Sequence, residues 1–362
     1  MRSSIPREKT ARSGRQESAF TLVELLVAAG ILALLVALLL NMVTQTSKTW
    51  KSTSGKIEQF RDAREAFDSI IRKVSQATLN NYLDYNNPTN PTAYIRQSEL
   101  RFLSGPVNRI LPTFGSNMVS TAVFFQAPNG FSTNTNNSIL QNTLNTWGYF
   151  IEYAADTNGR PGFLPLGRPA PRYRYRLMEL MEPTESLSVY NYTSTNRNFT
   201  GVDWITDALA STNRPAHMVA ENIIAMILLP KLARSDWPPN ASHPNTYDAA
   251  SLAPEYVYDS STNMNIGMSY PDNAILNTHN QLPPVIQVTL ISVDEASAVK
   301  FPAVYAQLTN TFMDNKWFFR ADSFDSDLSN CQAFLSGKKI NYRVFTTDVM
   351  IRGSKWSGSQ TN

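Results

Sequence analysis

The sequence predicts an α+β protein in which one long N-terminal helix, membrane-spanning in its first half, packs on an antiparallel sheet with long loop insertions. Residues 25–40 form an apolar run interrupted only by Gly30, which indicates a membrane helix. No proline occurs between Pro6 and Pro88, so nothing breaks a helix that continues past this run. Short β-branched and aromatic segments, separated by turn residues, follow to the end of the chain. This order of elements is typical of an α+β fold.

The first predicted element is one continuous helix from Phe20 to about Leu79. Residues 20–43 form its membrane half, because the 16 residues of the apolar run and their flanks reach the roughly 20 residues that cross a bilayer. Residues 44–80 form the half beyond the membrane, where apolar side chains recur at helical spacing: Ile57, Phe60, Phe67, Ile71 and Val74. A solvated coiled coil would show the same stripe, but this one is shorter than four heptads. We therefore expect it to pack on the sheet.

Seven later segments have the composition of strands, and all lie in a β-rich domain over residues 81–352. They are residues 99–103, 119–126, 147–154, 173–181, 219–229, 285–293 and 341–351. A short helix is expected at residues 203–210. Residues 82–91, rich in Asn and Pro, predict a turn region, and residues 230–281 predict an insertion of about 50 residues without secondary structure. Residues 353–362 are expected to form a flexible tail.

Glu24 is the only charged residue between Ala19 and Val43. A carboxylate inside a membrane helix costs about 2.5–3.5 kcal/mol on insertion scales, so such a residue usually has a function. The hexad AFTLVE at residues 19–24, between a basic leader and the apolar run, resembles the class III signal of type IV pilins and type II secretion pseudopilins. The one departure is Ala19, where most members have glycine.

This resemblance implies a pilin-like fold and a processed N-terminus. A prepilin peptidase would cleave between Ala19 and Phe20, removing residues 1–19 as a leader, and would N-methylate Phe20. Glu24 would then pair with the terminal amine of a neighbouring subunit. The resemblance also implies a single-pass inner-membrane protein whose N-terminus is cytoplasmic before processing. Its C-terminal domain would be periplasmic or part of a surface fibre, and its partners would be other pilin-like subunits and the peptidase.

Two narrower resemblances concern the rest of the chain. The order of its strands is similar to that of the minor pseudopilin J of type II secretion. Residues 123–128, 174–180 and 352–356 resemble the Verru_Chthon cassette protein C family, which covers nearly the whole chain. Members of that family are encoded together with other pilin-like proteins. The first resemblance implies a minor subunit of a fibre, and the second implies a pilin-type N-terminus.

Two other interpretations of the N-terminus fit the sequence less well. An ordinary signal peptide has its small-residue cleavage site after the apolar run, but residues 41–45 read NMVTQ and contain no A-x-A pattern. A plain membrane anchor has no need of Glu24 or of the full hexad. The leader holds five of the 32 basic and two of the 29 acidic residues, and this positive charge places it in the cytoplasm. The remaining chain has 27 basic and 27 acidic residues. No basic excess remains for nucleic acid.

No catalytic constellation is recognisable, so we expect no enzyme. The three histidines, His217, His243 and His279, are far apart in the sequence and form no zinc motif. Cys331, the single cysteine, cannot form an internal disulfide and is expected to be a small buried side chain.

Two weak calcium patterns are the only cofactor candidates. They are Asp156 with Asn158, and Asp325 with Asp327, the latter pair preceded by Asp322. We otherwise expect no cofactor.

The predicted function is that of a minor pilin-like (pseudopilin) subunit assembled through its N-terminal helix into a pilus or a type II secretion-like fibre. The alternative is a membrane-anchored periplasmic ligand-binding protein or adhesin that uses a pilin-type anchor.

Overall fold

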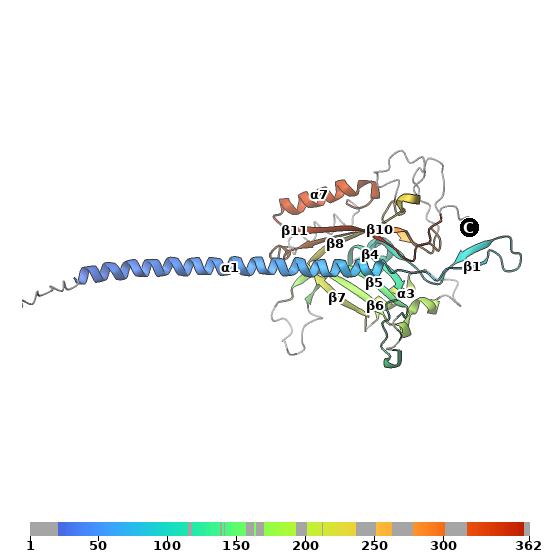
Figure 1. Cartoon of the computed structure of the whole chain (residues 1–362), viewed down its shortest axis with the longest axis horizontal. Coiled ribbons are helices and arrows are strands. Elements are labelled where there is room, and N and C mark those ends of the chain that lie inside the picture. Colours follow the sequence, from blue (N-terminus) through green and yellow to red (C-terminus); the bar gives the residue numbers. More distant parts are fainter. Residues whose placement is uncertain are drawn as a thin grey trace, which may run out of the picture. The chain divides into compact units, whose positions relative to one another are not determined.

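The computed structural model describes residues 21–114, 118–137, 140, 142–156, 163, 170–192, 201–211, 213–236, 251–262, 278–300 and 317–357. The chain forms two compact units, residues 1–54 and 55–362. The described part of the first unit is helical after Thr21. The second unit contains all the described strands (Figure 1).

Helix α1 spans Leu22–Val74 and contains no proline, as predicted for a continuous helix. It ends five residues before the predicted end at Leu79, because the following backbone groups pair with other segments. The N–H of Arg352 donates to the carbonyl of Ser75 at 2.9 Å, and the N–H of Thr78 donates to the carbonyl of Gln126 at 2.9 Å. These bonds replace the next helical turn.

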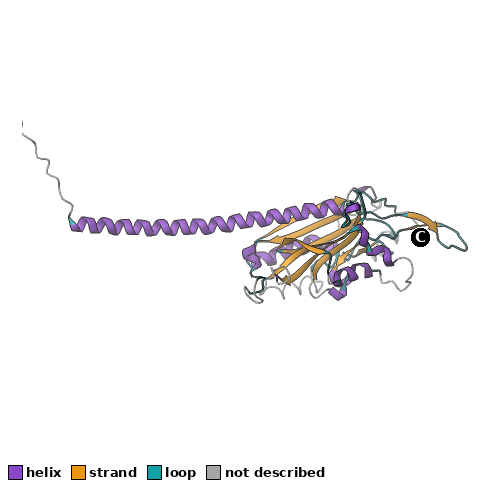
Figure 2. Ribbon diagram, turned by 90° about the horizontal axis from the view of Figure 1, so that it is seen from below, coloured by secondary structure: helices purple, strands orange, loops and turns teal. Residues whose placement is uncertain are grey.

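A six-stranded antiparallel sheet forms the centre of the second unit (Figure 2). Its strands, in spatial order, are β7 (Ala216–Glu221), β6 (Tyr173–Glu182), β5 (Asn145–Ala155), β4 (Met118–Ala127), β3 (Leu103–Pro106) and β9 (Tyr258–Asp259). The β5–β6 ladder runs from Thr146 opposite Glu182 to Ala155 opposite Tyr173. The strands predicted at residues 119–126, 147–154 and 173–181 are confirmed.

A second, three-stranded sheet has the order β11 (Tyr342–Met350), β10 (Val285–Val293) and β8 (Ile223–Lys231), with all neighbours antiparallel. Strand β10 has the bounds that the sequence predicted. It is buried along almost its whole length because it pairs on both edges.

The buried half of α1 packs against both sheets. Its side chains Ala63, Ala66, Phe67, Ile70 and Val74 belong to the larger hydrophobic core, together with residues of β4, β5, β6, β8, β10 and β11. The predicted packing of helix on sheet is confirmed for Phe67, Ile71 and Val74, but Ile57, which begins the predicted stripe, is 66% exposed. A smaller core lies on the opposite face of the six-stranded sheet, where Phe124 meets Trp204 of α3 (Asp203–Ala210). Neighbouring residues of β4 alternate between the two cores, as the two-residue period of a strand requires.

The remaining helical elements are short, apart from α7. They are α2 (Val107–Ile110), α5 (Glu295–Ala298), α7 (Phe324–Gly337) and the 3₁₀ turns η1 (Pro112–Phe114), η2 (Thr135–Asn137), η4 (Thr184–Ser186), η5 (Ser188–Tyr192), η6 (Arg234–Asp236) and η7 (Ala321–Ser323). Helix α7 was not predicted. It buries Phe324, Cys331 and Leu335 in the larger core, which confirms the buried cysteine.

Two predictions about turns and insertions were wrong. Residues 82–91 do not form only a turn, because β1 (Tyr82–Tyr85) pairs with β2 (Tyr94–Gln97) in a hairpin that extends away from the sheets in both views (Figures 1 and 2). The insertion at residues 230–281 is not structureless in its described parts. It contains β9, and its side chains Leu252, Ala253, Tyr256 and Tyr258 are fully buried. Residues 237–250 and 263–277 lie outside the described chain.

Two strand boundaries also differ from the prediction. The strand expected at residues 99–103 coincides with β3 only at Leu103, and residues 99–102 are not in a strand. The strand expected at residues 219–229 is divided into β7 and β8 at Asn222, whose φ of 61° is left-handed. Asparagine tolerates this conformation better than most residues, and the bend lets the chain pass from one sheet to the other.

Candidate functional site

Residues 22–43 of α1 present apolar side chains on all sides of the helix. Every residue from Thr21 to Val43 is exposed within the described chain. The most apolar window of 18 residues has a mean hydropathy of 2.8, and none of it is buried by other parts of the molecule. A helix that is apolar all round and uncovered by protein has the length and composition of a membrane span.

The start of this helix is a capping box formed by Thr21 and Glu24. The N–H and the hydroxyl of Thr21 both donate to Glu24 Oε2 at 3.0 Å, and the Glu24 N–H donates to the Thr21 hydroxyl oxygen at 3.3 Å. The two side chains therefore satisfy N–H groups that would be left without partners at a helix start. The T-x-x-E spacing at residues 21–24 is the sequence signal for this cap.

The capping box leaves part of the Glu24 carboxylate available. Both bonds from Thr21 reach Oε2, and Oε1 has no hydrogen-bond partner among the described residues. The side chain is exposed, at the end of the helix where the dipole favours a negative charge. One oxygen of Glu24 thus holds the helix start, and the other can accept a bond from a donor outside the chain.

Ala19 and Phe20, the predicted cleavage site, lie outside the described residues. The described helix begins two residues after Phe20, at Leu22.

Two of the calcium candidates, Asp156 and Asp327, accept hydrogen bonds from backbone N–H groups. Asp156 Oδ1 accepts from the Arg172 N–H at 2.9 Å, and Asn158 lies outside the described residues. Asp325 and Asp327 occupy the first turn of α7 and not a loop, and Asp327 Oδ2 accepts from the Phe318 N–H at 2.8 Å. Burial raises the pKa of Asp327. Within the described chain, no group of three or more His, Cys, Asp or Glu side chains is arranged to hold a metal ion.

A buried ion pair on β6 fastens the end of α1 to the six-stranded sheet. Lys73 Nζ lies 2.7 Å from Glu179 Oε2, and the Tyr149 hydroxyl donates to the same oxygen. His217 Nε2 lies 3.2 Å from the other Glu179 oxygen. Desolvation, followed by the charge of Glu179, raises the pKa of Tyr149 well above its ordinary value. His217 is therefore part of the cluster around Glu179, and His279, half-buried, contacts the side chain of Asn280.

Comparison with known proteins places the N-terminal segment in a recognised class. Residues 14–40 match the family described as the prokaryotic N-terminal methylation motif. No curated protein and no solved structure matches the chain. The matched segment contains the predicted cleavage site, the capping box and the whole apolar run of residues 25–40. Together with the uncovered apolar helix, the match supports a type IV pilin-like protein anchored in the membrane by a single span.

Proposed function

We propose that this chain is a minor pilin-like (pseudopilin) subunit, cleaved by prepilin peptidase between Ala19 and Phe20 and N-methylated at Phe20. It assembles through α1 into a pilus or a type II secretion-like fibre. The observation that carries the proposal is Glu24, a carboxylate at the start of an uncovered apolar helix, inside the segment that matches the methylation motif. One of its oxygens has no hydrogen-bond partner among the described residues.

The mechanism is electrostatic. A lone carboxylate in hydrocarbon is costly, and pairing with a cation lowers that cost. A neighbouring subunit processed in the same way would bring a cationic terminal amine to the level of Glu24, so the apolar helices associate where this pair forms. Before assembly, the bonds from Thr21 would reduce the cost of the unpaired carboxylate.

The second unit is then what the fibre presents outside the membrane. Because residues 123–128 and 174–180 resemble the Verru_Chthon cassette protein C family, we propose that its partners are pilin-like proteins encoded beside it. A protein with this motif is typically structural, and we assign this chain no reaction.

Three variants test the role of Glu24 by co-purification with other pilin-like subunits from detergent-solubilised membranes. Glu24→Gln keeps a side chain that can complete the capping box but removes the charge, so we expect it to abolish co-purification as fully as Glu24→Ala. Thr21→Val removes the cap and keeps the charge, and should still co-purify. All three should insert into the membrane like the wild type. Assembly of Glu24→Gln at the wild-type level would contradict the proposal.

A further inference from the structure

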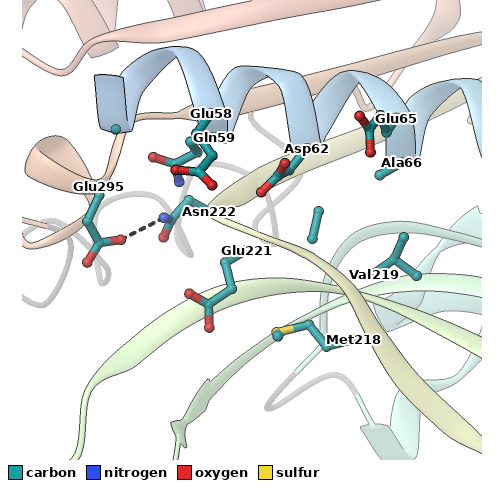
Figure 3. A pocket seen from close by; sticks show the side chains of 12 residues that line it. Glu58, Gln59, Asp62, Glu65, Ala66, Met218, Val219, Glu221, Asn222 and Glu295 are labelled. Atoms are coloured by element: carbon teal, nitrogen blue, oxygen red, sulfur yellow. Dashed lines mark hydrogen bonds between the residues drawn. The ribbon is translucent and has the colours of Figure 1, made fainter. Parts of the chain in front are cut away.

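A cavity of about 600 Å³ lies within the second unit, between α1 and the bend that joins β7 to β8 (Figure 3). Among the described residues that line it, the charged ones are all acidic: Glu58, Asp62, Glu65, Glu221 and Glu295. The three carboxylates of α1 lie at intervals of four and three residues, which puts them on one side of the helix. In Figure 3, the side chains of Glu58 and Asp62 point from α1 toward the strand that carries Glu221.

Asn222, at the bend itself, contributes a buried acceptor that lacks a partner. The residue is 2% exposed and lines the cavity. Its amide nitrogen donates to Glu295 Oε2 at 2.9 Å, which fixes the orientation of the amide. Its oxygen Oδ1 has no hydrogen-bond partner among the described residues, and the same holds for the buried oxygen of Gln59 on the α1 side of the cavity. Buried acceptors without donors are unfavourable, so both walls offer acceptors to a donor-rich group.

The described arginines near the cavity leave part of this acceptor capacity open. Arg174 pairs with Glu295 at 2.6 Å, and Arg172 lies 3.9 Å from the same oxygen. Arg61 approaches Asp62 and Glu65 only to 3.7 and 3.6 Å, and Arg176 approaches Glu221 only to 3.5 Å, beyond good hydrogen-bond distance. None of these arginines lines the cavity. Glu58 has no ion pair within the described part of the chain. The cavity therefore keeps acceptor capacity for a cation from outside.

We propose that this cavity receives a lysine or arginine side chain of a neighbouring pilin-like subunit. The inference rests on the proposed function, and it names a second contact for assembly, separate from Glu24. Charge complementarity favours a cationic occupant, and acceptors on two facing walls suit an ammonium or guanidinium with several N–H donors. One wall is α1, the helix through which the subunits associate.

Photo-crosslinking of the full chain in its own membranes tests the inference. Met218 lines the cavity and is 48% exposed, so Met218→p-benzoylphenylalanine places the reactive group at its wall. We expect an adduct with a pilin-like subunit, mapped by mass spectrometry to a peptide that contains the docking lysine or arginine. The double substitution Glu58→Gln with Asp62→Asn should lower the adduct yield about tenfold, because charge-assisted bonds are lost. Asp68→Asn, on the same helix but outside the cavity, is the matched control and should leave the yield unchanged.

Co-purification of the wild type and of Glu24→Ala from the same membranes separates this inference from the proposed function. If the wild type co-purifies with pilin-like subunits and Glu24→Ala does not, the proposed function stands. In that case, the cavity contact alone is overturned by either of two results. One is the absence of an adduct at position 218, and the other is an adduct yield that the double substitution leaves unchanged. If the wild type co-purifies with no pilin-like subunit, both proposals fall together.

Discussion

Lys73 provides the sharpest test of how α1 is held on the sheet. Its ammonium lies 2.7 Å from Glu179 Oε2 and 3.7 Å from the centre of the Trp147 ring. The Glu179 side chain is only 6% exposed, and the Lys73 side chain is 23% exposed. The substitution Lys73→Met keeps most of the apolar stem in place and leaves the Glu179 carboxylate buried without its cation.

The expected loss follows from these contacts. Removing one partner of a buried ion pair costs about 3–5 kcal/mol, and the lost contact with Trp147 adds about 0.5–1 kcal/mol. Tyr149 and His217 still bond to Glu179, and Lys73 is partly exposed, so the loss should lie at the lower end of this range. We predict that Lys73→Met lowers the free energy of unfolding by about 3 kcal/mol.

Urea unfolding of the full chain in detergent, followed by tryptophan fluorescence, measures this change, provided that the slope with denaturant stays constant. Arg61→Met on the same helix is the matched control, because its side chain is 63% exposed and its ion pairs are long. It should cost less than about 0.5 kcal/mol. A double-mutant cycle with Glu179→Gln should give a coupling energy of about 1 kcal/mol or more. If Lys73→Met costs no more than Arg61→Met, the assigned role of the ion pair is wrong.

Two further predictions concern a thiol and a carboxylate that are buried in the second unit. Cys331 is fully buried, and burial raises the pKa of its thiol to about 12. Ellman's reagent at pH 8 should therefore react at least about 100-fold more slowly with the native chain than with the chain in urea. Rapid labelling of the native chain would contradict the burial of Cys331. Burial alone would raise the pKa of Asp294, but hydrogen bonds from Ser297 and Asn341, together with Lys56, outweigh it and hold the pKa below its ordinary value. A carboxyl with a lowered folded-state pKa stabilises the fold fully above its unfolded-state pKa near about 4, and this stability is lost as the pH falls below that value. Asp294→Asn keeps a residue that can cap α5 and should flatten the decline in thermal stability between about pH 5 and pH 3. If the decline is the same in this variant, the protonation of Asp294 does not cause the loss of stability.

Local pattern was sufficient for much of the fold. The β-branched, aromatic and turn residues predicted strands β4, β5, β6 and β10 close to their observed bounds. The short helix expected at residues 203–210 is α3. Each of these segments pairs or packs along its whole length, so its local sequence agrees with its place in the fold. Helix α7 was missed although Phe324, Leu328, Cys331 and Leu335 recur at helical spacing. Its many Ser, Asn and Asp residues are weak helix formers, and packing on the larger core compensates for them.

Other features depend on contacts that local pattern does not contain. The bend at Asn222 exists because the chain passes from one sheet to the other, and nothing near it in the sequence signals a break. The β1–β2 hairpin was not predicted, because the Asn and Pro residues of its loop indicate a turn but not the short strands on either side.

The candidate sites also divide into one that the local sequence indicates and others that depend on contacts between distant residues. The hexad and the apolar run indicated Glu24 as a candidate site residue, and the T-x-x-E spacing is the signal for its capping box. Lys73 and Glu179 are 106 residues apart, and the cavity combines carboxylates of α1 with Glu221, Asn222 and Glu295. Only the fold brings these groups together, because each of them alone resembles an ordinary charged or polar surface residue.

The N-terminal mass of the mature chain, measured on protein isolated from its own membranes, tests the central claim most directly. We predict a chain that begins at Phe20 and carries one additional methyl group on the terminal amine. A chain that still begins at Met1, or one cleaved after the apolar run of residues 25–40, would contradict processing as a pilin-like subunit.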